Sequence, residues 1–157
     1  MKYVDKSYAS VRIPMRIWQL AGLCSVSTRQ ATVQNWMLLG VYFTRVFLHK
    51  MKKAKSPLCL CCNKSDEDLK HFLLHCDYFS DIREKYLPQY LAYNRSIIET
   101  FHDEETIIQT ILDPLSSNLP ENVRQHWSSP NSAYKTSREF CFNMHRKREK
   151  FYKKIET

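Results

Sequence analysis

The sequence predicts a mostly α-helical fold, because several features favour helices over sheets. Apolar residues recur at spacings of three and four along several segments of the 157-residue chain, which is the period of one buried helix face. Only two glycines occur, whereas sandwiches and barrels need many glycine-rich turns. Four of the six cysteines lie within positions 59–76, where a compact metal site would stabilise a small helical domain.

The first strong helical segment opens near Ser27 and is expected to continue to about Leu48. Positions 1–26 before it form a lead-in without a clear period. Ser27 and Gln30 match a capping box, and apolar residues then follow at helical spacing. Gly40 falls inside this expected helix, where glycine costs roughly 1 kcal/mol relative to alanine. Close packing against another element would offset that cost.

The next segment carries a compact set of metal-ligating residues. Its spacing is Cys-x2-Cys-x8-His-x4-Cys, and the residues are Cys59, Cys62, His71 and Cys76. Thiolate and imidazole are the ligands that Zn²⁺ takes in tetrahedral sites, and a Cys-x2-Cys turn brings two sulfurs to one ion. Three thiolates and one imidazole leave no position for water. The sequence therefore predicts one structural zinc ion that holds a small helical domain together.

Neighbouring residues leave an alternative interpretation of this segment open. Cys61 adjoins Cys62 and gives no room for a chelating turn, and His75 adjoins Cys76 and is expected to point elsewhere. His71 lies five residues before Cys76, a gap that suits a cysteine just past the end of a helix. The competing interpretation is a cluster of buried thiols beside a surface histidine.

The rest of the chain is expected to add helices around this site. Asp68 belongs to a looser cap of the short helix that carries His71, and Pro88 is expected to stop the helix after it. A further helical region opens at Ser96 and ends at Asp113. The chain thus divides into a lead-in, a helical zinc-binding domain, a loop rich in Ser, Asn and Pro, and a basic C-terminal helix, at positions 1–26, 27–112, 113–131 and 132–157.

The charge of the chain favours a polyanionic partner. Lysine and arginine number 24 against 16 acidic residues, which gives a formal net charge of +8 at pH 7. Basic residues gather just before the cysteines and again near the C-terminus. The residues expected to contact phosphates are Arg45, Lys50, Lys52, Lys53, Lys55, Arg146, Lys147, Arg148 and Lys150. A solvated basic surface without a nucleic-acid role is the competing interpretation.

Several motifs around the cysteines also follow a known pattern. They are the segment from Trp36 to Tyr42, the segment from Ser56 to Cys62, Glu67-Asp68, the segment from His71 to Cys76, and Ile82-Arg83. This pattern resembles the zinc-binding region at the C-terminal end of non-LTR retrotransposon reverse transcriptases. The family usually has threonine where this chain has Leu39, and Cys61 is an additional cysteine. The resemblance implies a module that helps a polymerase to engage nucleic acid.

The sequence therefore predicts a zinc-stabilised nucleic-acid-binding module without polymerase activity, with DNA and RNA both open as ligands. The alternative is a zinc-stapled helical scaffold for protein interactions, with a reverse transcriptase or another protein as partner. No enzyme is predicted, because the chain has no paired-aspartate polymerase motif. Asp68-Leu69-Lys70 matches only half of a nuclease pattern.

The expected location is intracellular, with nucleus and cytoplasm both open. No signal peptide is recognised at the start of the sequence, and no apolar run reaches the length of about 18 residues that suggests a membrane span. Cys24 and Cys141 lie far from the other cysteines and are expected to be buried thiols. At 157 residues the chain is too short for a polymerase, so the resemblance fits a detached terminal module, a fragment or a repurposed gene.

Overall fold

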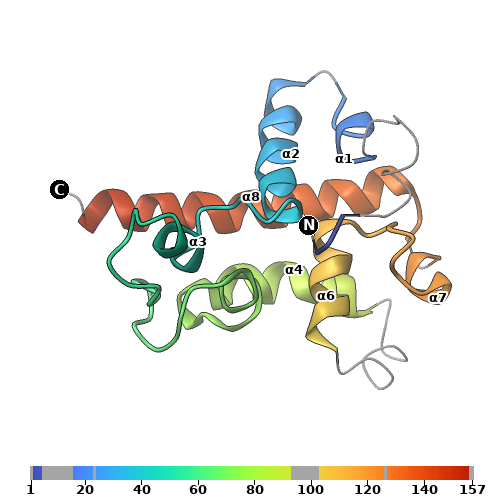
Figure 1. Ribbon diagram of the computed structural model, residues 1–157. Coiled ribbons are helices and arrows are strands. Elements are labelled where there is room, and N and C mark those ends of the chain that lie inside the picture. Colours follow the sequence, from blue (N-terminus) through green and yellow to red (C-terminus); the bar gives the residue numbers. More distant parts are fainter. Residues whose placement is uncertain (1, 5–15, 23, 93–102, 126, 156–157) are drawn as a thin grey trace.

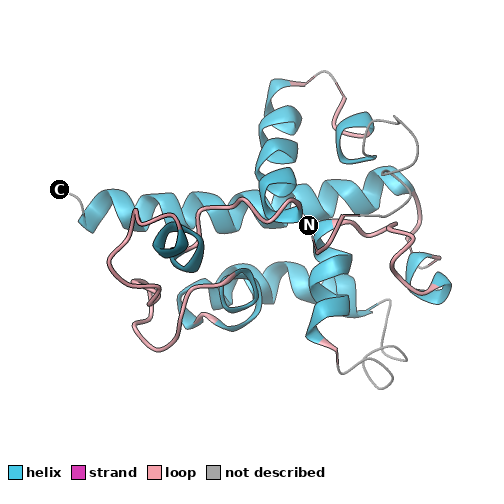
Figure 2. Cartoon of the chain, in the orientation of Figure 1, coloured by secondary structure: helices cyan, strands magenta, loops and turns pink. Residues whose placement is uncertain are grey.

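The long helix α8 (Pro130–Ile155) runs across the whole molecule, and the other helices pack along it (Figure 1). The computed structural model describes residues 2–4, 16–22, 24–92, 103–125 and 127–155. Within these ranges every regular element is helical, and strand-type pairing is limited to an isolated antiparallel bridge between Leu58 and Asp66 (Figure 2). The prediction of a mostly α-helical fold is therefore confirmed. None of the described helices is both long and apolar enough to cross a membrane.

The helices differ widely in length, and two short helical turns lie at the predicted metal ligands His71 and Cys76. Before α8 they are, in chain order, α1 (Arg16–Gln19), α2 (Ser25–Leu38), α3 (Arg45–Lys50), the π-helical turn η2 (His71–His75), the 3-10 turn η3 (Asp77–Phe79), α4 (Ser80–Ala92), α6 (Glu104–Leu112) and α7 (Glu121–Arg124). Helix α2 makes the most extensive contact with α8, and α4 and α6 also pack against it. Figure 1 shows α2 on one side of α8, with α4 and α6 on the other.

A continuous core of buried apolar side chains joins the long helices to the segment with the metal ligands. Phe72 and Phe79 from that segment and Phe140 from α8 have no exposed surface. Burying one such side chain contributes about 1.5–3 kcal/mol. The rings of Phe72 and Phe79 meet edge to face with their centroids 5.0 Å apart. The ligand segment is therefore anchored in the same core as α2 and α8.

The prediction of one continuous helix as far as Leu48 is wrong. The structure has two helices, α2 and α3, separated by a turn at Gly40. Gly40 has a φ of +72°, in the left-handed region that glycine adopts at little cost. Its amide donates to the carbonyl of Met37 at 3.1 Å, and the Val41 amide donates to the carbonyl of Trp36 at 3.0 Å. This pair of hydrogen bonds closes a helix C-terminus on a glycine. Gly40 thus ends α2 instead of packing inside a longer helix.

The predictions for the start of α2 and for the isolated cysteines are corrected in part. Helix α2 begins at Ser25, before the predicted cap Ser27, and no side chain caps it. Cys24, predicted to be buried, is exposed just before this helix. Cys141 is fully buried in α8 as predicted, and this burial raises the pKa of its thiol to about 12.

Pro88 does not stop its helix, because it lies inside α4. Proline removes one amide donor from a helix interior. The carbonyl of Glu84, four residues earlier, therefore lacks its usual helix donor. Both residues are exposed, so water can replace the lost hydrogen bond. The helix start predicted at Ser96 lies outside the described residues. Helix α6 begins after Asp103, whose carboxylate caps it by accepting the Glu105 amide at 3.0 Å.

The segment at 113–131, predicted to be a loop, contains the short helix α7 and the first residues of α8. Asp113 ends α6 as predicted. It is buried and accepts a hydrogen bond from the Tyr134 hydroxyl of α8. Leu119 and Val123 form a small buried cluster of their own. The segment therefore has a partly regular backbone and contributes to the interior.

Candidate metal centre

The structure brings the residues predicted as metal ligands into one group: Cys59, Cys62, His71 and Cys76. Their ligand atoms all lie within 4.8 Å of one another. The sulfurs of Cys59 and Cys76 are 3.7 Å apart, and Cys62 Sγ lies 3.3 Å from His71 Nε2. Thiolates bound at about 2.3 Å in a tetrahedron would be separated by about 3.8 Å. The group thus has the ligand types, number and spacing to hold a metal ion.

The ligands belong to a compact segment, the knuckle, which we define as residues 57–79. Its first part is a tight turn in which the Cys59 amide donates to the Ser65 carbonyl at 2.9 Å and the Asn63 amide donates to the Cys59 carbonyl at 2.8 Å. Asn63 adopts a left-handed backbone with a φ of +54°, which asparagine tolerates better than most residues. The turn therefore folds Cys59 and Cys62 toward one point without a glycine.

The second part of the knuckle is a π-helical turn that brings the other two ligands together. An α-helix would rotate the chain by about 140° over the five residue steps from His71 to Cys76, because it has about 3.6 residues per turn. Here the Cys76 amide bonds back to the His71 carbonyl at 2.8 Å, and Cys76 follows directly after the turn. The wider turn places both residues at the same site, and such turns are frequent where side chains have a function.

The environment of the sulfurs favours a cation. The neighbouring Cys61 and the backbone amides of Cys61 and Cys62 lower the pKa of the Cys59 thiol well below its ordinary value, although burial acts in the opposite direction. Burial acts in the opposite direction on Cys76 and raises the pKa of its thiol to about 12. Ligating cysteines must be deprotonated, and a bound cation supplies the positive charge that stabilises buried thiolates.

Cys61 takes part in a second, smaller group with Cys59 and Glu67, whose ligand atoms also lie within 4.8 Å of one another. The Glu67 carboxylate is already engaged, because Arg148 and the Arg45 amide donate to it. This group offers one ligand fewer than the Cys59–Cys76 group. The four-residue group is therefore the better candidate, and Cys61 lies beside it.

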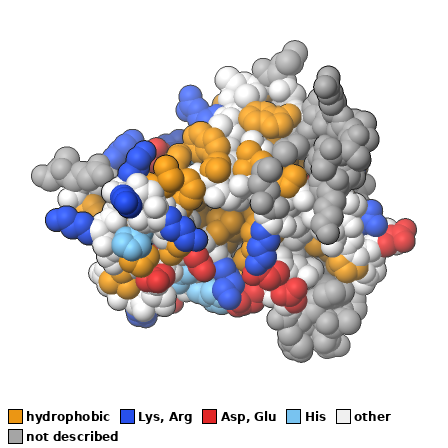
Figure 3. Space-filling model, viewed as in Figure 1, with side chains coloured by type: hydrophobic (Ala, Val, Ile, Leu, Met, Phe, Trp, Pro, Cys, Tyr) orange, Lys and Arg blue, Asp and Glu red, His pale blue; other side chains and the backbone are white. Residues whose placement is uncertain are grey.

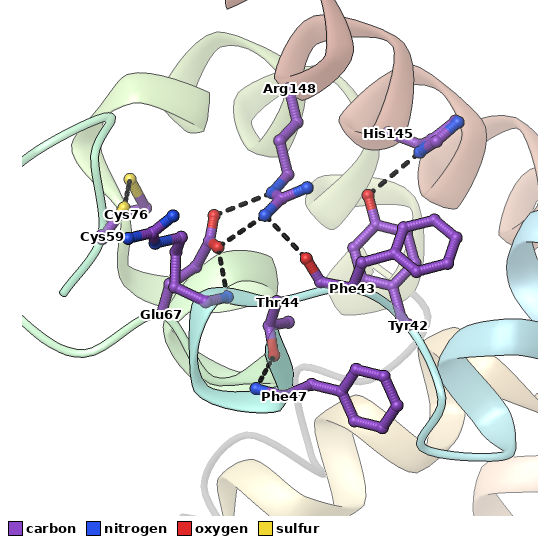
Figure 4. A network of polar contacts seen from close by, with 10 residues as sticks. Tyr42, Phe43, Thr44, Phe47, Cys59, Glu67, Cys76, His145 and Arg148 are labelled. Carbon is purple, nitrogen blue, oxygen red and sulfur yellow. Dashed lines mark hydrogen bonds and ion pairs between the residues drawn. The ribbon is translucent and has the colours of Figure 1, made fainter. Parts of the chain in front are cut away.

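A buried ion pair fastens the knuckle to α8 (Figure 4). Arg148 Nε and Nη2 donate to the two carboxylate oxygens of Glu67 at 2.9 and 2.7 Å, and Nη2 also donates to the Phe43 carbonyl at 2.8 Å. Glu67 is fully buried, and Arg148 has 7% of its surface exposed. Burial alone lowers the pKa of Arg148, but the hydrogen bonds and charge of Glu67 raise it overall. The pair thus favours the charged form of the Arg148 guanidinium.

Other polar contacts hold the individual ligand residues in place. Asp68 Oδ1 accepts the His71 amide at 2.7 Å, which fixes the start of the π-helical turn. Arg83 from α4 is buried and donates to the carbonyl of Cys76. These contacts position the backbone of two ligands from outside the metal group. Hydrogen bonds to residues that hold a metal orient those residues and support metal affinity.

His75 points away from the metal group, as the sequence predicts. Its Nε2 lies 2.7 Å from Glu104 Oε1 at the start of α6, and Lys70 reaches the same carboxylate at 3.0 Å. Lys70 and, to a smaller extent, His75 lower the pKa of Glu104. His75 therefore ties the knuckle to α6 and leaves the ligand position to His71.

The residues predicted to contact phosphates fall into different environments. Lys50, Lys52, Lys53 and Lys55 follow one another along the end of α3 and the turn after it, and all are exposed. Arg146 and Lys150 on α8 are exposed, and Arg45 is half-buried. Lys147 pairs with Asp81 at 2.6 Å and lies over the ring of Tyr78 at 4.7 Å. The exposed members are thus the four lysines near α3 and two residues of α8.

Arg148, which the sequence predicts to contact phosphate, is engaged inside the protein in this structure. Its guanidinium is buried and engaged by Glu67 and by the Phe43 carbonyl. A run of basic residues on a helix always turns some of them inward, because successive residues point about 100° apart. The sequence signal that could have identified the pair is Glu67, an acidic residue flanked by the predicted ligands.

Comparisons with known proteins give one partial similarity. No protein-family model and no solved structure matches the chain. A stretch of 49 residues, 31% of this chain, is 37% identical to part of the "Retrovirus-related Pol polyprotein from type-1 retrotransposable element R1 4" of Nasonia vitripennis. The match spans 12% of that polyprotein. The chain is therefore similar to a small part of a retrotransposon polyprotein.

Proposed function

We propose that this chain is a zinc-stabilised nucleic-acid-binding module related to the terminal region of retrotransposon polyproteins, and that it performs no catalysis itself. The observation that carries the proposal is the position of its exposed basic residues. The turn after α3 lies at the same end of the molecule as the C-terminal end of α8 (Figure 1). Lysine and arginine side chains gather at this end (Figure 3).

Zinc is the metal that fits the ligand group best. Three cysteine sulfurs and one histidine nitrogen form a soft donor set with no carboxylate, which disfavours magnesium and calcium. Cys59 and Cys76 are fully buried and His71 nearly so, which suits a structural site closed to water. Free thiols of this kind persist in reducing compartments, which supports an intracellular location.

The exposed lysines near α3 would act by neutralising phosphates. Along the chain, the four lysines lie between Tyr42 and Cys59, which both belong to the buried core, so their backbone is held on both sides. Contacts of lysine with phosphates position a nucleic acid without reading its bases. The expected binding is therefore weak to moderate, with little sequence discrimination and with DNA and RNA as possible ligands.

Salt dependence tests the nucleic-acid proposal. The affinity for a short oligonucleotide should fall linearly with salt concentration on logarithmic axes, with a slope that reports the number of phosphates contacted. The variant with Lys50→Gln, Lys52→Gln, Lys53→Gln and Lys55→Gln should bind more weakly with a shallower slope, while its metal content stays unchanged. Lys135→Gln, an exposed lysine in the first half of α8, is the control for charge on that helix. Absence of binding at low salt would reject the proposal.

Elemental analysis tests the metal proposal separately. Protein purified under reducing conditions should contain about one zinc ion per chain. Protein that is folded and contains no metal would show that the four residues are only a cluster of buried thiols with a histidine.

A second candidate function is a scaffold for protein interactions. The observation that favours it is a group of exposed apolar side chains on and around α3, where Val41 has 42%, Phe43 39% and Met51 52% of its surface exposed. A partner such as a reverse transcriptase could cover them. Binding of that partner should depend little on salt and should weaken in Phe43→Ser, which distinguishes this function from phosphate binding.

A further inference from the structure

A groove between α2 and α8 combines aromatic walls with a basic rim. It has a volume of about 460 Å³ and lies away from the metal group. Trp36 and Phe142 contribute aromatic surface to its lining, and Arg29, Arg146 and Lys153 contribute positive charge. Arg29 belongs to α2, and the other two basic residues belong to α8. Neither α3 nor the turn after it lines this groove.

The aromatic walls are held in place by their neighbours. The Trp36 ring packs against Phe43 with centroids 5.2 Å apart and meets the edge of His145 at 6.4 Å. His145 is fixed in turn, because its Nδ1 lies 3.1 Å from the Tyr42 hydroxyl (Figure 4). Trp36 is only half-buried, so part of its surface remains open to the groove. A ring that is already ordered loses little conformational entropy when a ligand stacks on it.

The charges at the rim favour a polyanion. Arg29 and Arg146 are exposed, and Arg146 lies over the Phe142 ring with its guanidinium carbon 5.8 Å from the ring centroid. Among the described residues that line the groove, Glu149 is the acidic one. Cations on both helices therefore flank a patch of aromatic surface. Aromatic platforms inside a positively charged groove are the arrangement that single-stranded nucleic acids require.

We propose that this groove binds an unpaired base of single-stranded nucleic acid, with Trp36 stacking on the base and Arg29 and Arg146 contacting the flanking phosphates. A duplex keeps its base faces covered by stacking, so it offers the groove phosphates alone. The inference rests on the proposed function, because it names the form of nucleic acid that the module prefers. The groove is a different site from the lysines near α3, which would contact the phosphates of single-stranded and duplex nucleic acid alike.

The decisive experiment compares strands that carry the same charge. Binding of a short oligothymidylate, of an equally long strand of abasic nucleotides and of an equally long duplex is measured at one salt concentration. Base stacking on one aromatic platform is worth on the order of tenfold in affinity. The protein should therefore bind oligothymidylate about tenfold more tightly than the abasic strand. Trp36→Leu should remove this preference and leave duplex binding unchanged.

Matched variants separate stacking from folding. Trp18→Leu is the control, because Trp18 on α1 is 37% exposed and does not line the groove. The Trp18→Leu protein should still bind oligothymidylate more tightly than the abasic strand. If Trp36→Leu loses zinc or helical signal, the exposed pair Arg29→Gln and Arg146→Gln replaces it. That double variant should lose affinity for oligothymidylate and show a shallower salt slope.

Several outcomes would overturn the inference. Equal affinity for oligothymidylate and the abasic strand would exclude base stacking while leaving the proposed function intact. A preference that survives in folded Trp36→Leu would place the stacking site elsewhere. An acidic peptide of equal charge that binds as tightly as oligothymidylate would identify the groove as a peptide site. Absence of binding to every strand at low salt would reject the inference together with the proposed function.

Discussion

The knuckle and the helical body of this protein are stabilised by different means. In the knuckle, residues 57–68 form no helix and pair only through an isolated bridge and a few turn hydrogen bonds, such as that from the Cys59 amide to the Ser65 carbonyl. The side chains of the candidate ligands converge within this segment and the turn that follows it. In the body, α2, α6 and the first half of α8 contain continuous helical hydrogen bonds and bury apolar side chains such as Ile111 and Phe140. We expect burial alone to stabilise the body, whereas we expect the knuckle to require a bound ion in addition to its contacts with the core.

The two regions meet at a few identifiable contacts. Phe72 and Phe79 insert from the knuckle into the common core, and the Glu67–Arg148 pair joins the knuckle to the second half of α8. The comparison teaches that the candidate metal group and the apolar core share one interior, and that a bound metal would give the knuckle a source of stability of its own. Substitutions in each region should therefore affect metal content and helical stability in different proportions.

Loss of a ligand should produce the largest effect. Cys62→Ser removes one of the four donors, and apparent free energies of structural zinc binding are on the order of 10 kcal/mol. The variant should lose its metal and the order of the knuckle, while α2 and α6 remain helical. Elemental analysis and circular dichroism measure both effects. Cys61→Ser and the exposed Cys24→Ser are the matched controls and should retain the metal. Metal loss in Cys61→Ser alone would mean that the ligand assignment is wrong.

Breaking the ion pair between the regions should be the next most damaging change. Glu67→Gln leaves the buried Arg148 charge without its carboxylate, which costs about 3–5 kcal/mol. Urea unfolding of the metal-bound protein measures this loss. A double variant, Glu67→Leu with Arg148→Met, should recover most of the stability, because an apolar pair of similar volume requires no desolvation of charge. A Glu67→Gln protein as stable as the parent would show that the pair contributes nothing.

A cavity in the body should lower stability without affecting the metal. Ile111 in α6 has no exposed surface, and Ile111→Ala should destabilise the protein by about 2–5 kcal/mol. Its zinc content after gentle purification should equal that of the parent. Val26→Ala is the control, because Val26 in α2 is exposed. This variant should have the same urea midpoint of unfolding as the parent protein. Parallel loss of metal in Ile111→Ala would contradict the separation of the two regions.

The smallest of these effects is expected at the turn between α2 and α3. Gly40→Ala places a side chain at a φ of +72°, where no heavy atom would clash with it, so only backbone strain of about 1 kcal/mol is expected. Gly40→Asn should cost less, because asparagine adopts this conformation more readily. Thermal unfolding of the two variants checks the order. Equal or higher stability of Gly40→Ala would show that the turn is not strained.

The sequence predicts the helical class and the composition of the metal group well, because both depend on local spacing. Helical periods identify α2, α6 and α8, and the Cys-x2-Cys pattern identifies residues that do come together. The break at Gly40 is missed because the apolar residues Phe43 and Phe47 continue the same spacing beyond the turn. A period reports which residues are apolar and carries no information about the backbone angle between them.

Long-range pairing is the part that the sequence does not provide. Arg148 stands in a basic run like its neighbours, and only the packing of α8 against the knuckle turns it toward Glu67, which is 81 residues away. The groove around Trp36 and Phe142 is missed for the same reason, since it exists only where α2 crosses α8. Predicting such contacts requires the arrangement of the helices in space.

Hydrogen exchange with and without a metal chelator tests most directly the claim that a metal-dependent knuckle rests on a metal-independent body. Removal of the metal should abolish amide protection in residues 57–79, including the bonds of the Cys59 and Cys76 amides. Protection in α2, in α6 and in the first half of α8 should persist, because these helices are stabilised by burial. Simultaneous loss of protection in both regions, or unchanged protection in the knuckle, would contradict the account.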